Sequence, residues 1–155
     1  MTTSINDDWA HAKTVALLVD WAYAVCDAPT ATPTDLAGAL KVELATAQTL
    51  GSQRIFPPPT GTTHLEFVLG HDDATVAFID VTPLGIVTIA DLEASFGEGH
   101  EAPTGPHEPA PTVIFDDIWP DGAARGCTVL ARLRPGPRET HDVATVTLYL
   151  QTERI

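Results

Sequence analysis

The hydrophobic pattern of this chain changes its period at residues 55–61, where three consecutive prolines follow Ile55 and Phe56. Before this segment, apolar residues recur at spacings of three and four, which is typical of amphipathic helices. After it they recur at every second residue, which is typical of strands with one buried face. The sequence therefore predicts a single domain of 155 residues with a helical part over residues 7–50, a proline-rich extended connector over residues 55–61 and a sheet-rich part over residues 62–155.

Two helices are predicted in the first part of the chain. The second should begin after Thr32, because a threonine can cap a helix and Pro33 suits its first turn. It should continue past Ala47 and end at Gly51 in a left-handed cap. The first should run from about Asp7 to Asp27, since one helical stripe is formed by Trp9, Ala12, Ala16, Val19, Tyr23 and Cys26.

The sheet-rich part predicts a mainly antiparallel sheet of about five to six strands, because short loops join its alternating segments. A third, short helix is predicted from Thr88, whose pairing with Asp91 resembles a capping box, to Gly97. Residues 98–111 contain four prolines and two glycines, which predicts an exposed, mobile loop. Two N-terminal helices and one short internal helix packed on such a sheet define an α+β fold. Clear strand patterns lie at residues 64–69, 74–81, 112–116, 127–134 and 144–150.

The segment from Gly85 to Leu150 resembles the helix-plus-sheet modules of the beta-lactamase-inhibitor-protein and outer-membrane-lipoprotein assembly families. The resemblance rests on the order of a short helix, a polar stretch and a strand meander, and on the sequence DLEASFG at residues 91–97. It covers less than half of the chain. It implies a helix beside a β-meander and carries no functional residue to this sequence.

Charge and cysteine content restrict the partners and the compartment. The chain has 8 Lys+Arg and 21 Asp+Glu, a formal net charge of −13, and no basic run. Nucleic acid and anionic membranes are therefore excluded as partners. No apolar run approaches the roughly 18 residues that span a bilayer, and the N-terminus lacks the pattern of a secretory signal. We expect a cytoplasmic protein in which Cys26 and Cys127 are two reduced, buried thiols, and the oligomeric state stays open.

An acidic loop around Trp119 is the favoured interaction site. A tryptophan rimmed by Asp116, Asp117 and Asp121 would give a rigid anchor and would attract a basic partner. This pattern favours a non-catalytic protein-binding module, such as an adaptor or an immunity-type protein, that captures a basic protein by charge complementarity. The same residues also form ordinary solvated turns, and acidic residues also simply keep a protein soluble, so both alternatives stay open.

A second hypothesis concerns the loop over residues 98–108. His100-Glu101 and His107-Glu108 repeat after seven residues, and their imidazole and carboxylate groups could converge on a divalent metal. The chain would then be a metal-binding protein or a small hydrolase-like enzyme. A loop rich in proline and glycine gives such ligands no rigid scaffold, which favours solvated side chains instead. The sequence has no nucleophile elbow and no phosphate-binding loop, so we expect no catalytic residue, no metal and no cofactor.

Overall fold

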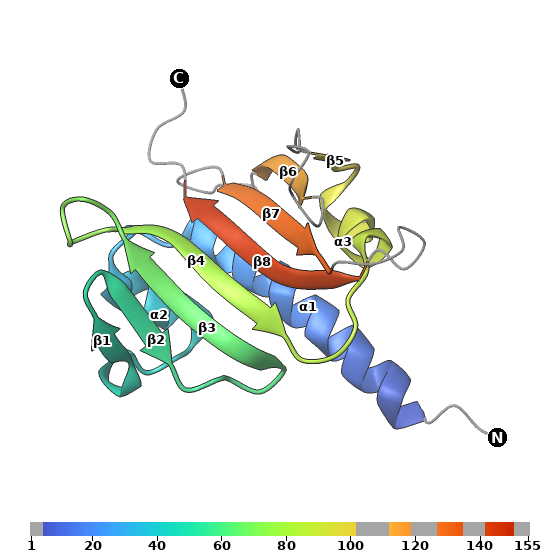
Figure 1. The fold of residues 1–155 in the computed structure, drawn as a ribbon, viewed down its shortest axis with the longest axis horizontal. Coiled ribbons are helices and arrows are strands. Elements are labelled where there is room, and N and C mark those ends of the chain that lie inside the picture. Colours follow the sequence, from blue (N-terminus) through green and yellow to red (C-terminus); the bar gives the residue numbers. More distant parts are fainter. Residues whose placement is uncertain (1–4, 102–111, 119–126, 135–141, 151–155) are drawn as a thin grey trace.

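The computed structural model of the protein describes residues 5–101, 112–118, 127–134 and 142–150, with side chains from residue 13 onward and without that of residue 117. These residues form three α-helices and one antiparallel sheet (Figure 1). The sheet has eight strands in the order β1-β2-β3-β4-β8-β7-β6-β5. The predicted α+β class is confirmed, whereas the predicted number of five to six strands is wrong.

Helix α1 (Ile5–Asp27) lies behind the sheet in Figure 1 and contacts β7 (Cys127–Leu133) and β8 (Val143–Leu150). Its buried side is formed by Leu18, Trp21, Ala22 and Val25. Ala16, which belongs to the predicted stripe, is exposed. The inward face is therefore centred on Leu18 and Ala22, which each precede a residue of the predicted stripe by one position, and the bulky Trp21 is buried beside them.

Helix α2 (Pro33–Leu40) begins as predicted but ends earlier. The Thr32 hydroxyl accepts a hydrogen bond from the Asp35 N–H at 3.3 Å. The helix ends because Lys41 adopts a left-handed conformation (φ 60°, ψ 41°), and its N–H returns to carbonyl groups of the last turn. A three-residue 3-10 helix, η1 (Leu44–Thr46), follows. The prediction of a helical part extending to residue 50 is therefore wrong.

Two of the strands missed from the sequence are β1 (Gln48–Leu50) and β2 (Gln53–Phe56), which form a hairpin. Gly51 sits at its turn with φ +58°, so the left-handed glycine serves a hairpin and not a helix end. Phe56 is buried, and its ring centroid lies 4.7 Å from that of Phe67 on β3. Strand pairing thus continues through Ile55 and Phe56 and stops where the prolines remove the backbone donors. The predicted connector is wrong for these two residues.

Strands β3 (Thr62–Leu69) and β4 (Val76–Pro83) form the central hairpin. Its loop is fixed by Asp72, whose Oδ1 accepts the backbone N–H groups of Ala74 at 3.0 Å and Thr75 at 3.1 Å. These hydrogen bonds, together with one from the Thr75 hydroxyl, hold the pKa of Asp72 below its ordinary value. A short loop between the strands predicted at residues 64–69 and 74–81 is thereby confirmed.

Strand β8 (Val143–Leu150) lies between β4 and β7 (Cys127–Leu133), although β4 and β8 are far apart in the sequence. Strands β6 (Thr112–Ile118) and β5 (His100–Glu101) complete the sheet. The predicted meander of the last three strands is confirmed. Part of the predicted loop at residues 98–111 is instead the short edge strand β5, and residues 102–111 lie outside the described part.

Helix α3 (Ile89–Phe96) has the predicted capping box. The Thr88 N–H donates to Asp91 Oδ2 at 2.9 Å, and the Asp91 N–H donates to the Thr88 hydroxyl at 3.2 Å. Gly97 ends the helix with φ +85°, a value that favours glycine. Leu92 is fully buried, so this short helix contributes to the core.

A disulfide between Cys26 and Cys127 joins the end of α1 to β7, across 101 residues of sequence. The two Cα atoms are 5.8 Å apart, and both side chains are buried. The prediction of two reduced thiols is therefore wrong. Each cysteine lies on the apolar face of its element, as predicted, and the two faces meet because α1 packs against β7.

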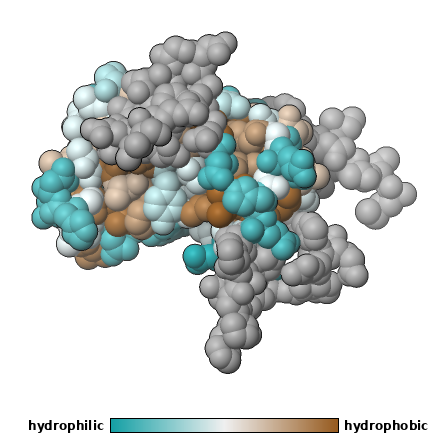
Figure 2. Space-filling view, turned by 90° about the horizontal axis from the view of Figure 1, so that it is seen from above, coloured by the Kyte–Doolittle hydropathy of each residue, from teal (hydrophilic) through white to brown (hydrophobic). Residues whose placement is uncertain are grey.

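No helix among the described residues is both long and apolar enough to cross a membrane. The surface seen from above carries hydrophilic, intermediate and hydrophobic patches side by side (Figure 2).

Candidate functional site

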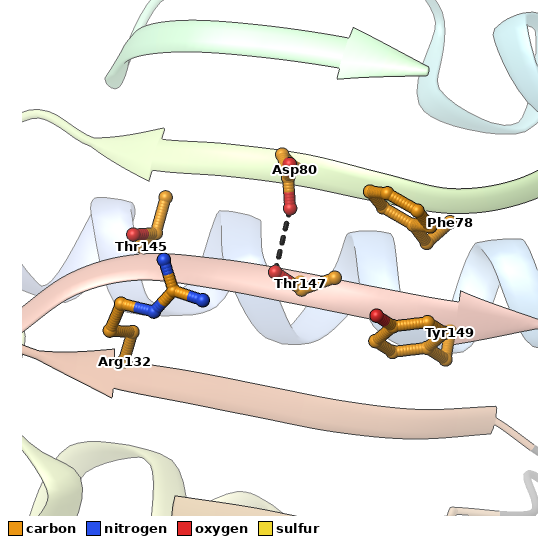
Figure 3. A pocket seen from close by; sticks show the side chains of 6 residues that line it. All are labelled: Phe78, Asp80, Arg132, Thr145, Thr147 and Tyr149. Atoms are coloured by element: carbon orange, nitrogen blue, oxygen red, sulfur yellow. Dashed lines mark hydrogen bonds between the residues drawn. The ribbon is translucent and has the colours of Figure 1, made fainter. Parts of the chain in front are cut away.

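The face of the sheet opposite α1 carries a shallow depression across β4, β7 and β8 (Figure 3). Its volume is 240 Å³. Side chains alternate between the two faces of a strand, so the residues that line it are spaced by two on β4 and on β8. The lining residues are Phe78, Asp80, Arg132, Thr145, Thr147 and Tyr149.

One end of the depression is aromatic. Phe78 and Tyr149 face each other on β4 and β8, with ring centroids 5.2 Å apart and ring planes inclined at 39°. Tyr149 remains 41% exposed. The pair therefore stabilises the strand contact and still offers an apolar surface at the open face of the sheet.

The other end of the depression holds one anionic and one cationic group. Asp80 Oδ1 accepts a hydrogen bond from the Thr147 hydroxyl at 2.6 Å, and Arg132 pairs with Thr145 in the register of β7 and β8. Figure 3 shows the guanidinium lying over β8 beside Thr145, on the side facing Asp80. The structure gives Arg132 neither an ion pair nor a side-chain hydrogen bond with any other described residue. Its donors are therefore available to an anionic ligand.

A second polar group on this face surrounds Glu66, which stands directly opposite Asp80 on β3. Like charges in facing positions are unfavourable in a sheet. Glu66 is compensated by hydrogen bonds with Gln53 Nε2 at 2.8 Å and His64 Nε2 at 3.0 Å. The carboxylates of Glu66 and Asp80 thus each accept a hydrogen bond from a side chain, and of the two only Asp80 lines the depression.

One residue of the predicted acidic loop, Asp116, contacts one residue of the predicted metal site, His100. His100 Nε2 and Asp116 Oδ2 are 2.6 Å apart, and their side chains are 60% and 55% exposed. These residues come from β5 and β6, and Glu101 is exposed beside them. Among the described residues no group of three or more His, Cys, Asp or Glu could hold a metal ion. Outside the described part are the Asp117 side chain and Trp119, Asp121, His107 and Glu108.

The sequence pattern gave no indication of the depression, because its lining residues come from three separate strands and not from one loop. Phe78 and Asp80 precede Tyr149 by about seventy residues, and no local motif joins them. The outward position of each residue follows from the strand alternation. What could not be read from the pattern is that β8 inserts beside β4, which brings the six residues together.

The fold defines an α+β protein with an eight-stranded antiparallel sheet and one open sheet face. No protein-family model and no curated protein sequence matches this chain. Among solved structures, it is similar to a DUF4309 family protein, YjgB, from Bacillus subtilis subsp. subtilis str. 168. The two are 15% identical, the match covers 92% of this chain and 99% of that chain, and the TM-score is 0.55. At this identity the likeness shows a shared fold alone.

Proposed function

We propose that the protein is a non-catalytic binding module that captures a basic protein partner at the sheet edge formed by β5 and β6. The observation that carries the proposal is Asp116, an exposed carboxylate held by His100 from the neighbouring strand. A carboxylate fixed in this way loses less side-chain freedom when a partner binds. Glu101 adds an exposed acid at the same edge.

The charge of the whole chain supports a basic partner. A formal net charge of −13 attracts a cationic protein over long range, and complementary charge raises the association rate more than the final affinity. The sequence-based candidates Asp117, Trp119 and Asp121 belong to this proposed interface as neighbours of Asp116 in the chain. The competing interpretation is that the acids serve solubility alone.

The test is affinity capture from the native host with matched charge variants, at low and at moderate salt. One variant neutralises the edge by Asp116→Asn, Asp117→Asn and Asp121→Asn. The control neutralises three acids that are exposed elsewhere, by Asp20→Asn, Glu43→Gln and Asp73→Asn. Both variants have the same net charge, so general electrostatics changes equally.

We expect one basic protein, in near-stoichiometric amount, to be retained by the wild type and the control. It should be lost from the edge variant, and lost from the wild type at moderate salt because exposed charges are screened. Equal retention by both variants would remove the edge from the interface. Capture of nothing specific would leave solubility as the role of the acids.

We further propose that the protein works in an oxidising compartment, because the Cys26–Cys127 disulfide persists there and is rare in the cytosol. The cytoplasmic location expected from the sequence is the competing proposal. Rapid alkylation of thiols in intact host cells, followed by mass spectrometry, distinguishes the two. One unmodified disulfide supports the oxidising compartment, and two alkylated cysteines support the cytoplasm.

A further inference from the structure

We propose that the depression between β4, β7 and β8 binds a free α-amino acid that carries an apolar or aromatic side chain. This proposal goes beyond the binding of a protein at the β5–β6 edge and does not depend on it. It rests on three properties of the depression: two opposite charges, an aromatic end and a small volume.

The two charges select a ligand that is itself zwitterionic. The guanidinium of Arg132 presents paired N–H donors that match a carboxylate. Asp80 uses Oδ1 to accept the Thr147 hydroxyl, and the structure shows no described donor on Oδ2, which can accept from an ammonium group. A purely cationic ligand would be repelled by Arg132, and a purely anionic ligand by Asp80. An α-amino acid satisfies both groups at once.

The aromatic pair accommodates the side chain of the same ligand. Phe78 and Tyr149 lie next to Asp80 and Thr147 along their strands, so an amino acid held at its charged end extends toward the rings (Figure 3). Apolar and aromatic groups pack favourably on such rings. The partly exposed Tyr149 leaves room for this contact.

The small volume favours a ligand of about the size of a single amino acid. Sites for drug-sized molecules enclose about 300–1,000 Å³, whereas this depression measures 240 Å³. A nucleotide or a longer peptide would extend well beyond the lining residues. An amino acid places its three recognised parts, which are carboxylate, ammonium and side chain, within the depression.

The experiment is a titration of the isotope-labelled full chain, followed by the amide resonances of β4, β7 and β8. The probe is L-phenylalanine, and two analogues each lack one charge: 2-phenylethylamine has no carboxylate and 3-phenylpropionate has no amine. Titration to about 10 mM detects a dissociation constant near 1 mM. We expect phenylalanine to shift these resonances and to bind at least about tenfold more tightly than either analogue, because each loses a charge-assisted hydrogen bond.

Two variants test the role of each charge separately. Arg132→Gln should weaken phenylalanine by about tenfold or more and abolish the preference over 2-phenylethylamine. Asp80→Asn should abolish the preference over 3-phenylpropionate, while its amide oxygen still accepts from Thr147 and keeps the local structure. The matched controls are Arg134→Gln and Asp20→Asn, which alter exposed residues outside the depression and should leave affinity unchanged.

The proposal would be overturned if phenylalanine caused no localised shift, or if either analogue bound as tightly as phenylalanine. Equal binding of N-acetylphenylalanine or phenylalanine amide would also overturn it, because it would indicate that the depression binds a peptide terminus. A fourth contrary result would be a loss of affinity in the two control variants as great as in Arg132→Gln and Asp80→Asn. The edge variant used to test partner capture should bind phenylalanine normally, so the two proposals fail independently.

Discussion

Removing the disulfide should destabilise the protein strongly. The change is Cys26→Ala combined with Cys127→Ala. The bond closes a loop across 101 residues, and in the chain-entropy model a loop of about 100 residues contributes roughly 4.7 kcal/mol. Loss of a native disulfide costs about 2–5 kcal/mol in practice. At about 2–4 °C per kcal/mol for a chain of this size, we expect Tm to fall by roughly 5–20 °C.

The assay is urea unfolding of the wild type, with and without a reductant, and of the double variant. A cross-link restricts the unfolded chain, so the double variant and the reduced wild type should also show larger m-values. Val25→Ala is the matched control, because it opens a small cavity one residue from Cys26 at a fully buried position and leaves the cross-link intact. It should lower stability without raising the m-value.

The reasoning would be refuted if the double variant and the wild type unfolded with free energies equal to within about 0.5 kcal/mol, a difference typical of neutral surface changes. It would also be refuted by two titratable thiols in the denatured, unreduced wild type. Addition of a reductant to the double variant should change nothing, which excludes effects of the reductant itself.

Three further changes test local features. Thr88→Ala removes the cap of α3 and should cost about 1 kcal/mol in chemical unfolding; no loss would contradict the capping role. Gly99→Ala should lower the free energy of unfolding by about 1–3 kcal/mol, because its Cβ would lie 2.7 Å from Val113 Cγ1. Gly38→Ala, in open space on a helix, should raise it by about 0.5–1 kcal/mol. A stabilising Gly99→Ala together with a destabilising Gly38→Ala would refute the packing described for these two positions. Asp72 should titrate below its ordinary pKa by NMR. Because the folded state lowers this pKa, the stabilisation is complete above the unfolded pKa and is lost as the pH falls through the folded value; an ordinary or raised pKa would contradict the loop geometry.

The sequence correctly predicted the start of each helix that begins with a capping side chain. The cap at Thr32 and the capping box at Thr88 depend on side chains within three residues, and both are present as predicted. The alternating strands also follow from a local pattern. The hairpin of β1 and β2 was not predicted, because its two strands are short, contain several polar residues and end next to prolines. No local pattern marks these segments as strands, and β2 is held in the sheet by its pairing with β3.

For the candidate sites, too, the sequence indicated single residues but not the contacts between segments that are far apart in the chain. Asp116 was predicted from its loop, but its contact with His100 requires the pairing of β5 with β6. The Cys26–Cys127 bond requires α1 to pack on β7. The depression requires β8 to lie beside β4, and no periodicity in a single segment specifies which strands become neighbours.

The position of β8 has a consequence for synthesis of the protein. Among the described strands, β1 to β4 form one group and β7, β6 and β5 form another, and in the order of the sheet only β8 joins the two groups. Until residues 143–150 have left the ribosome, β4 and β7 each present an unpaired edge, which is a site for association with other chains. Since β8 is the last of the eight described strands to be synthesised, the growing chain depends on α1 and the core, or on a chaperone, to protect both edges until then.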